Sequence, residues 1–207
     1  MCGRFVRHTP AKLIATLFDC LPPAADIPPS ANVAPTQLVA AVRMGANGRE
    51  LVGLRWGLIP SWSKDAKTAY KLINARAETV AEKPAFRSAF KSRRCLLPAD
   101  GFYEWRTLGK AKQPYLFRPR DRQPFAFAGL WEHWQPPTVA DLWGSAEPPA
   151  PIESCTIITT TANELVGEIH DRMPVMLPQS AWQQWLDHAD ESLLRQYPAT
   201  AMESAPA

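Results

Sequence analysis

The amino-acid sequence predicts a single α+β domain whose antiparallel, barrel-like β core is flanked by short helices. Three observations lead to this class. The 207 residues are enough for one large domain with a proper hydrophobic core. Strand-like apolar runs are interleaved with short helical segments along the whole chain. The proline content, 21 residues, favours many turns and short strands over a helical bundle.

The first half of the chain is expected to hold a helix, a hairpin and a helical pair. A proline at the first helical position predicts a short helix over 9–19, followed by a proline-rich loop. The runs 37–44 and 49–57 flank the turn sequence GANG and predict a β-hairpin. Residues 74–92 are predicted to be helical in two pieces that break at Pro84.

Strands dominate the prediction for the second half. Strand-like runs cover 95–106, 113–119, 124–134, 155–162 and 174–177. A surface loop insertion of low expected order covers 135–154. Short helices are predicted over 164–170, 179–186 and 191–197, and the last ten residues are expected to be a tail.

Composition and charge restrict the function class. A net charge of +3 and a pI near 8.7 permit a polyanionic partner without requiring one. No apolar run approaches the ~20 residues that span a bilayer, so we expect no membrane association. The four cysteines contain no C-x-x-C pair, and the histidines lack ligand spacing. We therefore expect no metal, no cofactor and a reducing, cytoplasmic setting.

Cys2 is the first candidate for chemistry. If Met1 is removed, Cys2 carries a free α-amine beside its thiol, with ordinary pKa values of about 7.7–8.0 and about 8.5. Such an amine can attack an aldehyde to give an imine, and the thiol can then close a five-membered thiazolidine ring. A small buried apolar cysteine is the ordinary alternative, and position 2 alone does not separate the two.

Two polar stretches offer acid–base groups. In HDRMPVML, His170 lies where a predicted helix gives way to a strand, and a histidine titrates near pH 6.5. The ordinary alternative is a turn residue with satisfied hydrogen bonds. In ADGFYEWR, strand alternation places Phe102 and Glu104 on one face. A glutamate on an apolar face has a raised pKa and suits general acid–base catalysis, whereas a solvent-facing one does not.

Two further stretches carry aromatic, amide and charged groups. In WGLIPSW, Trp56 and Trp62 could be core residues or a platform on which bases stack. In NARAET, Asn74 could cap the following helix. Arg76 could pair with a phosphate, or only with Glu78.

Taken together and in this order, a set of motifs resembles the SOS-response-associated peptidase family: MCGRF, NVAPTQ, WGLIPSW, NARAET, RRCLLPADGFYEW, FAFAGLWE and TTTANELVGEIHDRMPVML. The motifs are long and mutually independent. The resemblance runs from the first residue to about residue 188. It implies a barrel-like α+β catalytic domain over 1–190 that contains the loop 135–154, followed by a C-terminal helix and tail over 191–207.

The resemblance also implies a function. Cys2, exposed once Met1 is removed, is expected to attack the ring-opened aldehyde of an abasic site in single-stranded DNA. The product would be a thiazolidine DNA–protein crosslink that shields the lesion during the DNA-damage response. Asn74 is implied to hold the sugar and the N-terminal cysteine, and Glu104 to shuttle protons. His170 is implied to assist the Schiff-base step and crosslink reversal.

Six residues are assigned to DNA binding by the same resemblance: Arg4, Arg76, Arg172, Trp56, Trp62 and Thr160. The arginines are expected to hold phosphates, and the tryptophans lie in the segment that wedges against bases. The threonine lies in the strand that leads to the active site. The expected partner is single-stranded DNA containing abasic sites. The protein is expected to be a monomer, associated with the nucleoid if it is bacterial.

Two other functions stay open at this point. An N-terminal-nucleophile peptidase or amidohydrolase would also use Cys2 behind Met1, and it would need an oxyanion hole and a substrate pocket. A non-catalytic reader of single-stranded DNA would bind without a covalent bond. For such a reader, Cys2→Ala would bind abasic DNA as durably as the parent.

Overall fold

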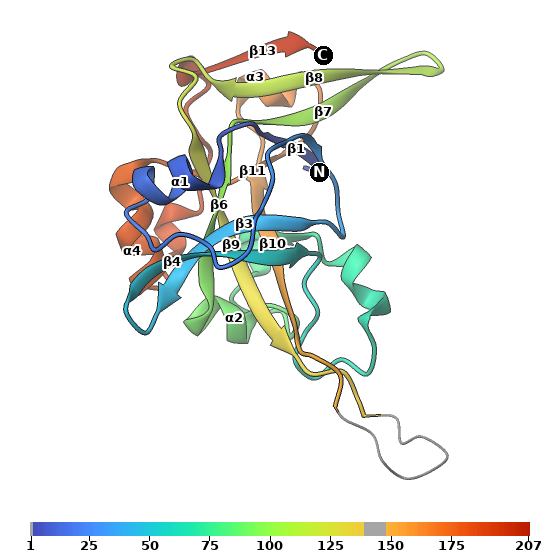
Figure 1. Ribbon diagram of the computed structural model, residues 1–207. Helices are drawn as coiled ribbons and strands as arrows, with labels where there is room; N and C mark the ends of the chain where they lie inside the picture. The colour runs from blue at the N-terminus through green and yellow to red at the C-terminus, as the bar shows by residue number, and fades with distance from the viewer. Residues whose placement is uncertain (1, 139–147) are drawn as a thin grey trace.

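Two β-sheets organise the chain in the computed structural model, which describes residues 2–138 and 148–207 (Figure 1). The upper sheet in Figure 1 runs in the order β13 (Met202–Pro206), β8 (Ala111–Pro119), β7 (Gly101–Leu108), β1 (Arg4–Arg7) and β2 (Ser30–Val33). Its neighbouring strands are antiparallel. This sheet carries the N-terminal strand in its interior, between β7 and β2.

The other sheet runs in the order β11 (Arg172–Pro174), β10 (Ile152–Thr161), β4 (Gly48–Trp56), β3 (Leu38–Gly45), β6 (Arg94–Ala99), β9 (Phe125–Trp134) and β12 (Met176–Leu177). Strand β10 pairs with both β4 and β9, so β10, β4, β3, β6 and β9 close into a ring. The predicted barrel-like α+β fold is therefore confirmed. Two strand pairings differ from the predicted antiparallel arrangement: β4 and β5 (Asn74–Arg76) each run parallel to β10.

Three short helices pack against strands of this ring: α1 (Ala11–Leu17), α2 (Arg87–Ser92) and α4 (Trp182–Asp187). A fourth, α3 (Glu164–Gly167), contacts β11 and β13 instead. Short 3₁₀ segments lie elsewhere along the chain: η1 (Ala66–Lys71), η2 (Ala77–Thr79), η3 (Gln179–Ala181), η4 (Glu191–Leu193) and η5 (Ala199–Ala201). Helix α1 starts after Pro10, as the sequence predicts. The Phe18 ring then stacks on Trp182 at a centroid distance of 3.9 Å. This contact joins the N-terminal helix to α4. No helix among residues 2–138 and 148–207 is long and apolar enough to cross a membrane.

Both faces of the ring are buried. Alternate side chains of each strand point to opposite sides of the sheet, so one strand contributes to two hydrophobic clusters. In β3, Ala40 and Val42 belong to the cluster packed under the helices, whereas Val39 and Ala41 belong to the cluster between the two sheets. Phe5 of β1 anchors the N-terminal strand in the latter cluster. Its ring lies 5.3 Å from Trp56 and 5.7 Å from Phe127, both in edge-on contact.

The chain passes between the sheets at Asp100. The predicted strand 95–106 is in fact two strands, β6 and β7, which lie in different sheets. The Asp100 carboxylate accepts hydrogen bonds from the backbone N–H groups of His8 and Thr9 and from the Thr9 hydroxyl, at 2.5–2.9 Å. This corner therefore fixes β1 beside β7.

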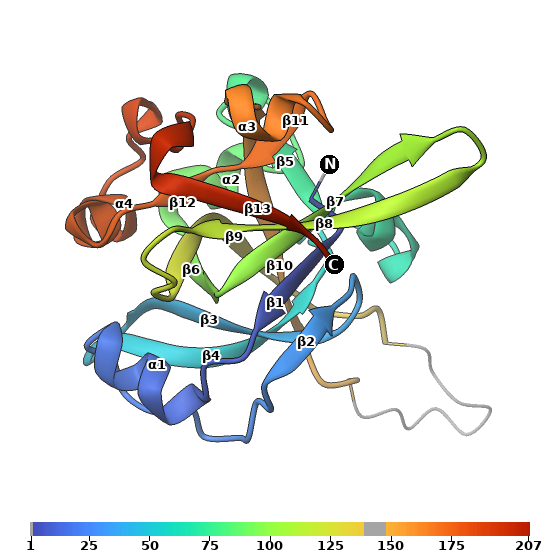
Figure 2. The same ribbon diagram turned by 90° about the horizontal axis from the view of Figure 1, so that it is seen from above.

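Three predicted elements are wrong. Residues 74–79 form β5 and η2 instead of a helix, because β5 gains backbone pairing with β10 that outweighs local helix propensity. The last residues form β13 instead of a tail, and the predicted helix 191–197 is reduced to η4. Figure 2 shows β13 beside β8, where it pairs with the N–H and C=O groups of that strand. Of the predicted loop 135–154, residues 139–147 lie outside the described residues, and β10 already begins at Ile152.

Candidate active site

The four predicted catalytic residues come from separate segments and meet on one side of the molecule. Asn74, the first residue of β5, donates a hydrogen bond from Nδ2 to the carbonyl oxygen of Cys2 at 2.9 Å. Glu104 of β7 and His170, between α3 and β11, line one cavity of about 520 Å³. The Glu104 charge also acts on the Cys2 thiol. The structure therefore brings Cys2, Asn74, Glu104 and His170 together.

Cys2 is held by the strand that follows it. Strand β1 pairs with β7 and β2, and Phe5 anchors it in the core. Cys2 itself is fully buried, and its Sγ lies 3.9 Å from the carbonyl oxygen of Arg4. Burial raises the pKa of the Cys2 thiol far above its ordinary value, and the nearby Glu104 charge raises it further. The thiol is therefore neutral at physiological pH in this state.

Asn74 is placed by the parallel pairing of β5 with β10, in which Asn74 lies opposite Ile157. One end of its amide contacts Cys2. The other end, Oδ1, is buried and has no hydrogen-bond partner among the described residues. A buried acceptor of this kind costs free energy unless a ligand or water satisfies it. Asn74 can thus hold the N-terminal residue and accept a hydrogen bond from a substrate at the same time.

Glu104 confirms the alternation predicted for β7. Phe102 and Glu104 are 0% and 3% exposed, whereas Tyr103 and Trp105 are only partly buried. Burial raises the pKa of the Glu104 carboxyl, and the charge of His170 opposes this shift. A carboxyl with a raised pKa is protonated over a wider pH range, so it can donate a proton as well as accept one.

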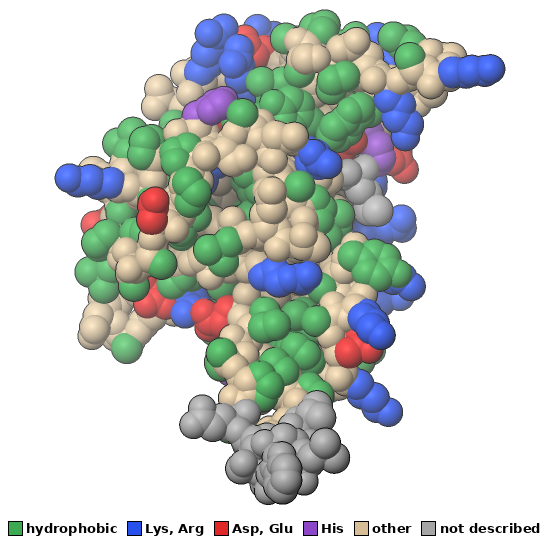
Figure 3. All heavy atoms as spheres, turned by 45° about the vertical axis from the view of Figure 1, so that its right-hand side comes forward, with side chains coloured by type: hydrophobic (Ala, Val, Ile, Leu, Met, Phe, Trp, Pro, Cys, Tyr) green, Lys and Arg blue, Asp and Glu red, His purple; other side chains and the backbone are tan. Residues whose placement is uncertain are grey.

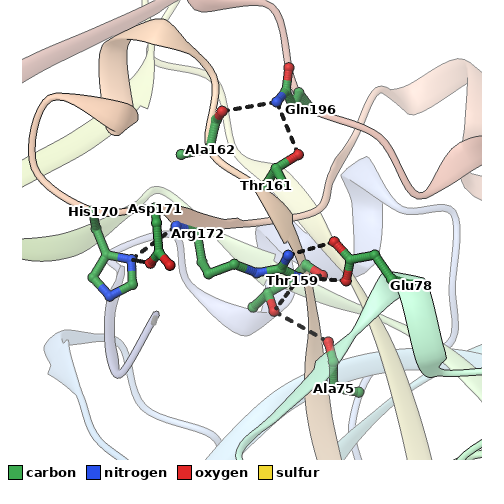
Figure 4. A network of polar contacts seen from close by, with 9 residues as sticks. All are labelled: Ala75, Glu78, Thr159, Thr161, Ala162, His170, Asp171, Arg172 and Gln196. Atoms are coloured by element: carbon green, nitrogen blue, oxygen red, sulfur yellow. Dashed lines mark hydrogen bonds and ion pairs between the residues drawn. The ribbon is translucent and has the colours of Figure 1, made fainter.

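His170 is oriented by the turn that follows α3. Its Nδ1 accepts the backbone N–H of Arg172 at 3.0 Å and lies 2.9 Å from Oδ1 of Asp171 (Figure 4). The side chain is 29% exposed. Because the turn engages Nδ1, proton exchange with a substrate falls to Nε2. His170 and Glu104 can therefore exchange protons with a molecule in the same cavity.

Comparison with known proteins identifies the family. The family model of the SOS response associated peptidase (SRAP) matches residues 1–207. The chain belongs to the SRAP family. The abasic site processing protein YoaM of Bacillus subtilis (strain 168) is 44% identical over 214 residues, covering 99% of this chain and 89% of that protein. The abasic site processing protein HMCES of Gallus gallus is 38% identical over 156 residues, covering 69% of this chain and 46% of that protein.

Solved structures share this SRAP fold. A protein from Bacteroides thetaiotaomicron superimposes with a TM-score of 0.84 at 26% identity, covering 99% of this chain and 91% of that chain. A protein from Bordetella bronchiseptica superimposes with a TM-score of 0.83 at 29% identity, covering 100% and 99%. The two-sheet architecture is thus shared with solved proteins over 91% and 99% of their chains.

Two residues of this SRAP chain that were predicted to bind DNA are instead buried and hydrogen-bonded within the protein. Trp56 is fully buried, and its Nε1 donates to the carbonyl oxygen of Ile73 at 2.9 Å, so it cannot wedge against bases. Arg172 is 8% exposed, and its guanidinium is held by Glu78 and Thr159. The Arg172 guanidinium is therefore engaged within the fold, and its phosphate contact stays a prediction.

The other DNA candidates differ in exposure. Thr160 lies in β10 as expected, but it is only 7% exposed, which argues against direct contact with DNA. Arg76 is exposed at the end of β5, and Trp62 is 66% exposed. Arg4 is partly exposed, and its Nη1 donates to Oδ1 of Asn32 at 2.9 Å. Figure 3 shows Lys and Arg side chains spaced along one edge of this side of the molecule, interleaved with apolar ones.

The sequence analysis missed the other residues that line the cavity: Trp105, Thr107, Lys112 and Ile169. Lys112 lies opposite Thr107 in the β7–β8 hairpin, and the register of that hairpin was the signal that could have found it. Among the described residues, no group of three or more His, Cys, Asp or Glu side chains could hold a metal ion. A larger cavity, about 810 Å³, lies between α1 and the β3–β4 turn and contains none of the candidate residues.

Proposed function

We propose that this SRAP protein processes abasic sites in single-stranded DNA by forming a thiazolidine crosslink through Cys2 after removal of Met1. The observation that carries the proposal is the hydrogen bond from Asn74 to the Cys2 carbonyl, beside the cavity that Glu104 and His170 line. It supports the proposal because it fixes the backbone of Cys2, the residue whose amine and thiol would react. The relatives named abasic site processing proteins support the choice of substrate.

The chemistry balances without an oxidant or a reductant. The α-amine nitrogen of Cys2 attacks the aldehyde carbon of the ring-opened sugar, and the aldehyde oxygen takes a proton. Loss of that oxygen as water leaves an imine. The Cys2 sulfur then attacks the imine carbon, a C–S bond forms, and the thiol proton ends on the nitrogen. The net reaction joins protein and DNA and releases one water molecule.

The acid–base groups divide these proton transfers. A protonated Glu104 carboxyl can donate to the departing hydroxyl, and the resulting carboxylate can accept the thiol proton. Its raised pKa widens the pH range over which the carboxyl can serve as the proton donor. His170, on the same cavity, can donate a hydrogen bond from Nε2 to the aldehyde oxygen and so polarise the carbonyl as the amine attacks. Asn74 contributes by fixing the Cys2 backbone, which holds amine and thiol toward one carbon.

The burial of the Cys2 thiol supports an order in which the amine attacks the aldehyde first and the sulfur closes the ring afterwards. A desolvated, neutral thiol is a poor nucleophile, so Cys2 would react slowly by itself. Formation of the imine places an electrophilic carbon beside the sulfur and makes the ring closure intramolecular. The crosslink would then be selective for aldehydes, because the amine must react first.

Exposed side chains among the candidate residues support binding of single-stranded DNA. Arg4 and Arg76 can neutralise phosphates, and Trp62 offers a ring on which a base can stack. Neither kind of contact depends on base identity, which suits a protein that must recognise a missing base. Affinity should fall as salt concentration rises, with a slope of log K against log salt concentration of about −0.7 per phosphate neutralised.

The test compares the parent, shown by mass to begin at Cys2, with Cys2→Ala on an oligonucleotide that bears one abasic site. We expect a band that survives boiling in detergent for the parent alone. Equal amounts of durable complex in both proteins would contradict the proposal and favour a non-catalytic reader. Peptide hydrolysis by the parent without any durable complex would instead favour the peptidase of the family's name.

A further inference from the structure

The Arg172 side chain is enclosed by the fold. Its guanidinium donates to both carboxylate oxygens of Glu78 and, at 2.6 Å, to the carbonyl oxygen of Thr159 (Figure 4). Two parallel bonds to one carboxylate define the plane of the guanidinium and fix its orientation. Only 10% of the Arg172 side chain is exposed, whereas 47% of the Glu78 side chain is, so the guanidinium is shielded from solvent and the carboxylate lies at the surface.

The backbone of Arg172 contacts the His170 ring. The N–H of Arg172 donates to Nδ1 at 3.0 Å, and Oδ1 of Asp171 lies 2.9 Å from the same nitrogen. An unprotonated Nδ1 accepts the backbone N–H, which places the proton of a neutral ring on Nε2. A ring that carries a proton on Nδ1 can donate to Asp171 instead. The turn therefore offers a partner to each protonation state of His170.

The ion pair also connects two parts of the site across β10. Strand β10 pairs at Thr159 with β5 on one side and with β11 on the other. Glu78 lies directly after β5, in η2, and Arg172 is the first residue of β11. The pair therefore ties the segment that holds Asn74 to the turn that holds His170.

We propose that Glu78 and Arg172 form a positioning pair for His170. The pair holds the turn so that the Arg172 N–H selects the neutral ring protonated on Nε2, the nitrogen that donates a hydrogen bond to the substrate aldehyde oxygen. Among the described residues that line this cavity, Glu104 of β7 and Lys112 of β8 are the other ionisable groups. The inference rests on the proposed function, in which His170 polarises the aldehyde.

The test uses Glu78→Gln, which removes the charge, keeps the shape and changes a side chain that is 47% exposed. In protein labelled with ¹⁵N at histidine, the ring nitrogen shifts show which nitrogen carries the proton. We expect Nε2 alone to be protonated on the neutral His170 ring of the parent, and a mixture of tautomers in the variant. We also expect crosslinking at saturating DNA to slow about 10- to 100-fold, with DNA affinity unchanged within about twofold. Glu78→Asp, which keeps the charge, should restore part of the rate.

A matched control breaks an ion pair elsewhere. Glu203→Gln removes the Arg118–Glu203 pair, whose side chains are 30% and 29% exposed, at the β8–β13 edge. It should leave the His170 tautomer and the crosslinking rate unchanged. The proposal is overturned if Glu78→Gln keeps the parent tautomer, whether or not the rate falls, because a slower rate alone indicates general loss of structure. The tautomer measurement needs no DNA, so it stands even if the parent forms no crosslink.

Discussion

Asn74 and Cys2, 72 residues apart in sequence, are joined by a 2.9 Å hydrogen bond from the Asn74 side-chain amide to the Cys2 carbonyl oxygen. The bond depends on two independent pairings, β5 with β10 and β1 with β7. It holds the second residue of the chain in one position, although chain ends are usually mobile. The account of crosslinking given above depends on this placement.

Asn74→Ala should slow crosslinking about fivefold. The variant loses one hydrogen bond that orients the reacting residue, and a bond of this kind contributes about 1 kcal/mol. Single-turnover rates on abasic single-stranded DNA, measured beside thermal unfolding, would check this. A parent-like rate in a folded variant would remove Asn74 from the mechanism.

Glu104→Gln should raise the free energy of unfolding above that of the parent at pH 8, and this difference should disappear near pH 4. The folded-state pKa of Glu104 is raised, whereas the unfolded chain titrates near the ordinary value of about 4.3. Between the two values the folded state binds more protons, so the parent loses stability as pH rises through that window. A gain of about 1 kcal/mol would raise Tm by about 2–4 °C in a chain of this size.

Thermal unfolding of both proteins across pH 4–8 measures this difference, and a Tm difference independent of pH would contradict it. The same variant should crosslink slowly at every pH, because glutamine neither donates nor accepts the required proton. A more stable and less active variant would mark Glu104 as a residue kept for chemistry at a cost in stability.

Trp62→Ala should lower the affinity for DNA, whereas Trp56→Ala should lower the stability of the fold. The exposed Trp62 can stack on a base, so its loss should weaken single-stranded DNA binding by about 1–3 kcal/mol without lowering Tm. The buried Trp56 fills the core, so its loss should cost about 3–5 kcal/mol of unfolding free energy. Fluorescence anisotropy with labelled DNA and denaturant titration separate the two effects. Equal DNA affinity of Trp62→Ala and the parent would remove the stacking role.

Arg76→Ala should reduce the salt dependence of DNA binding. Loss of one phosphate contact should make the slope of log K against log salt concentration shallower by about 0.7. Arg87→Ala is a fitting control, because Arg87 is also exposed but lies on α2, outside the site. Equal slopes for the parent and both variants would show that Arg76 does not contact a phosphate.

Local patterns predicted much of this fold. The hairpin of β3 and β4 and the inward face of Glu104 follow from strand alternation and turn residues that lie close together in sequence. Strands β5 and β13 were missed because each owes its conformation to a partner strand far along the chain. Long-range pairing of that kind leaves no local signature.

The site could be predicted only in part for the same reason. The family motifs pointed to Cys2 and to the three candidate residues that the fold brings near it, Asn74, Glu104 and His170. They could not separate the buried Trp56 from the exposed Trp62, since both are apolar residues in one segment. Nor could they show that Arg172 is bound to Glu78, 94 residues away, because this pairing arises only when β5 and β11 flank β10.

The most direct test of the central claim is the mass of the N-terminal peptide after reaction with abasic single-stranded DNA. The DNA would be digested to a single nucleotide remnant before proteolysis and mass spectrometry. The account predicts a peptide that begins at Cys2 and carries the abasic sugar with the loss of one water molecule, the sugar joined at both nitrogen and sulfur. A remnant on a lysine, or an unmodified Cys2 peptide beside a durable complex, would contradict it.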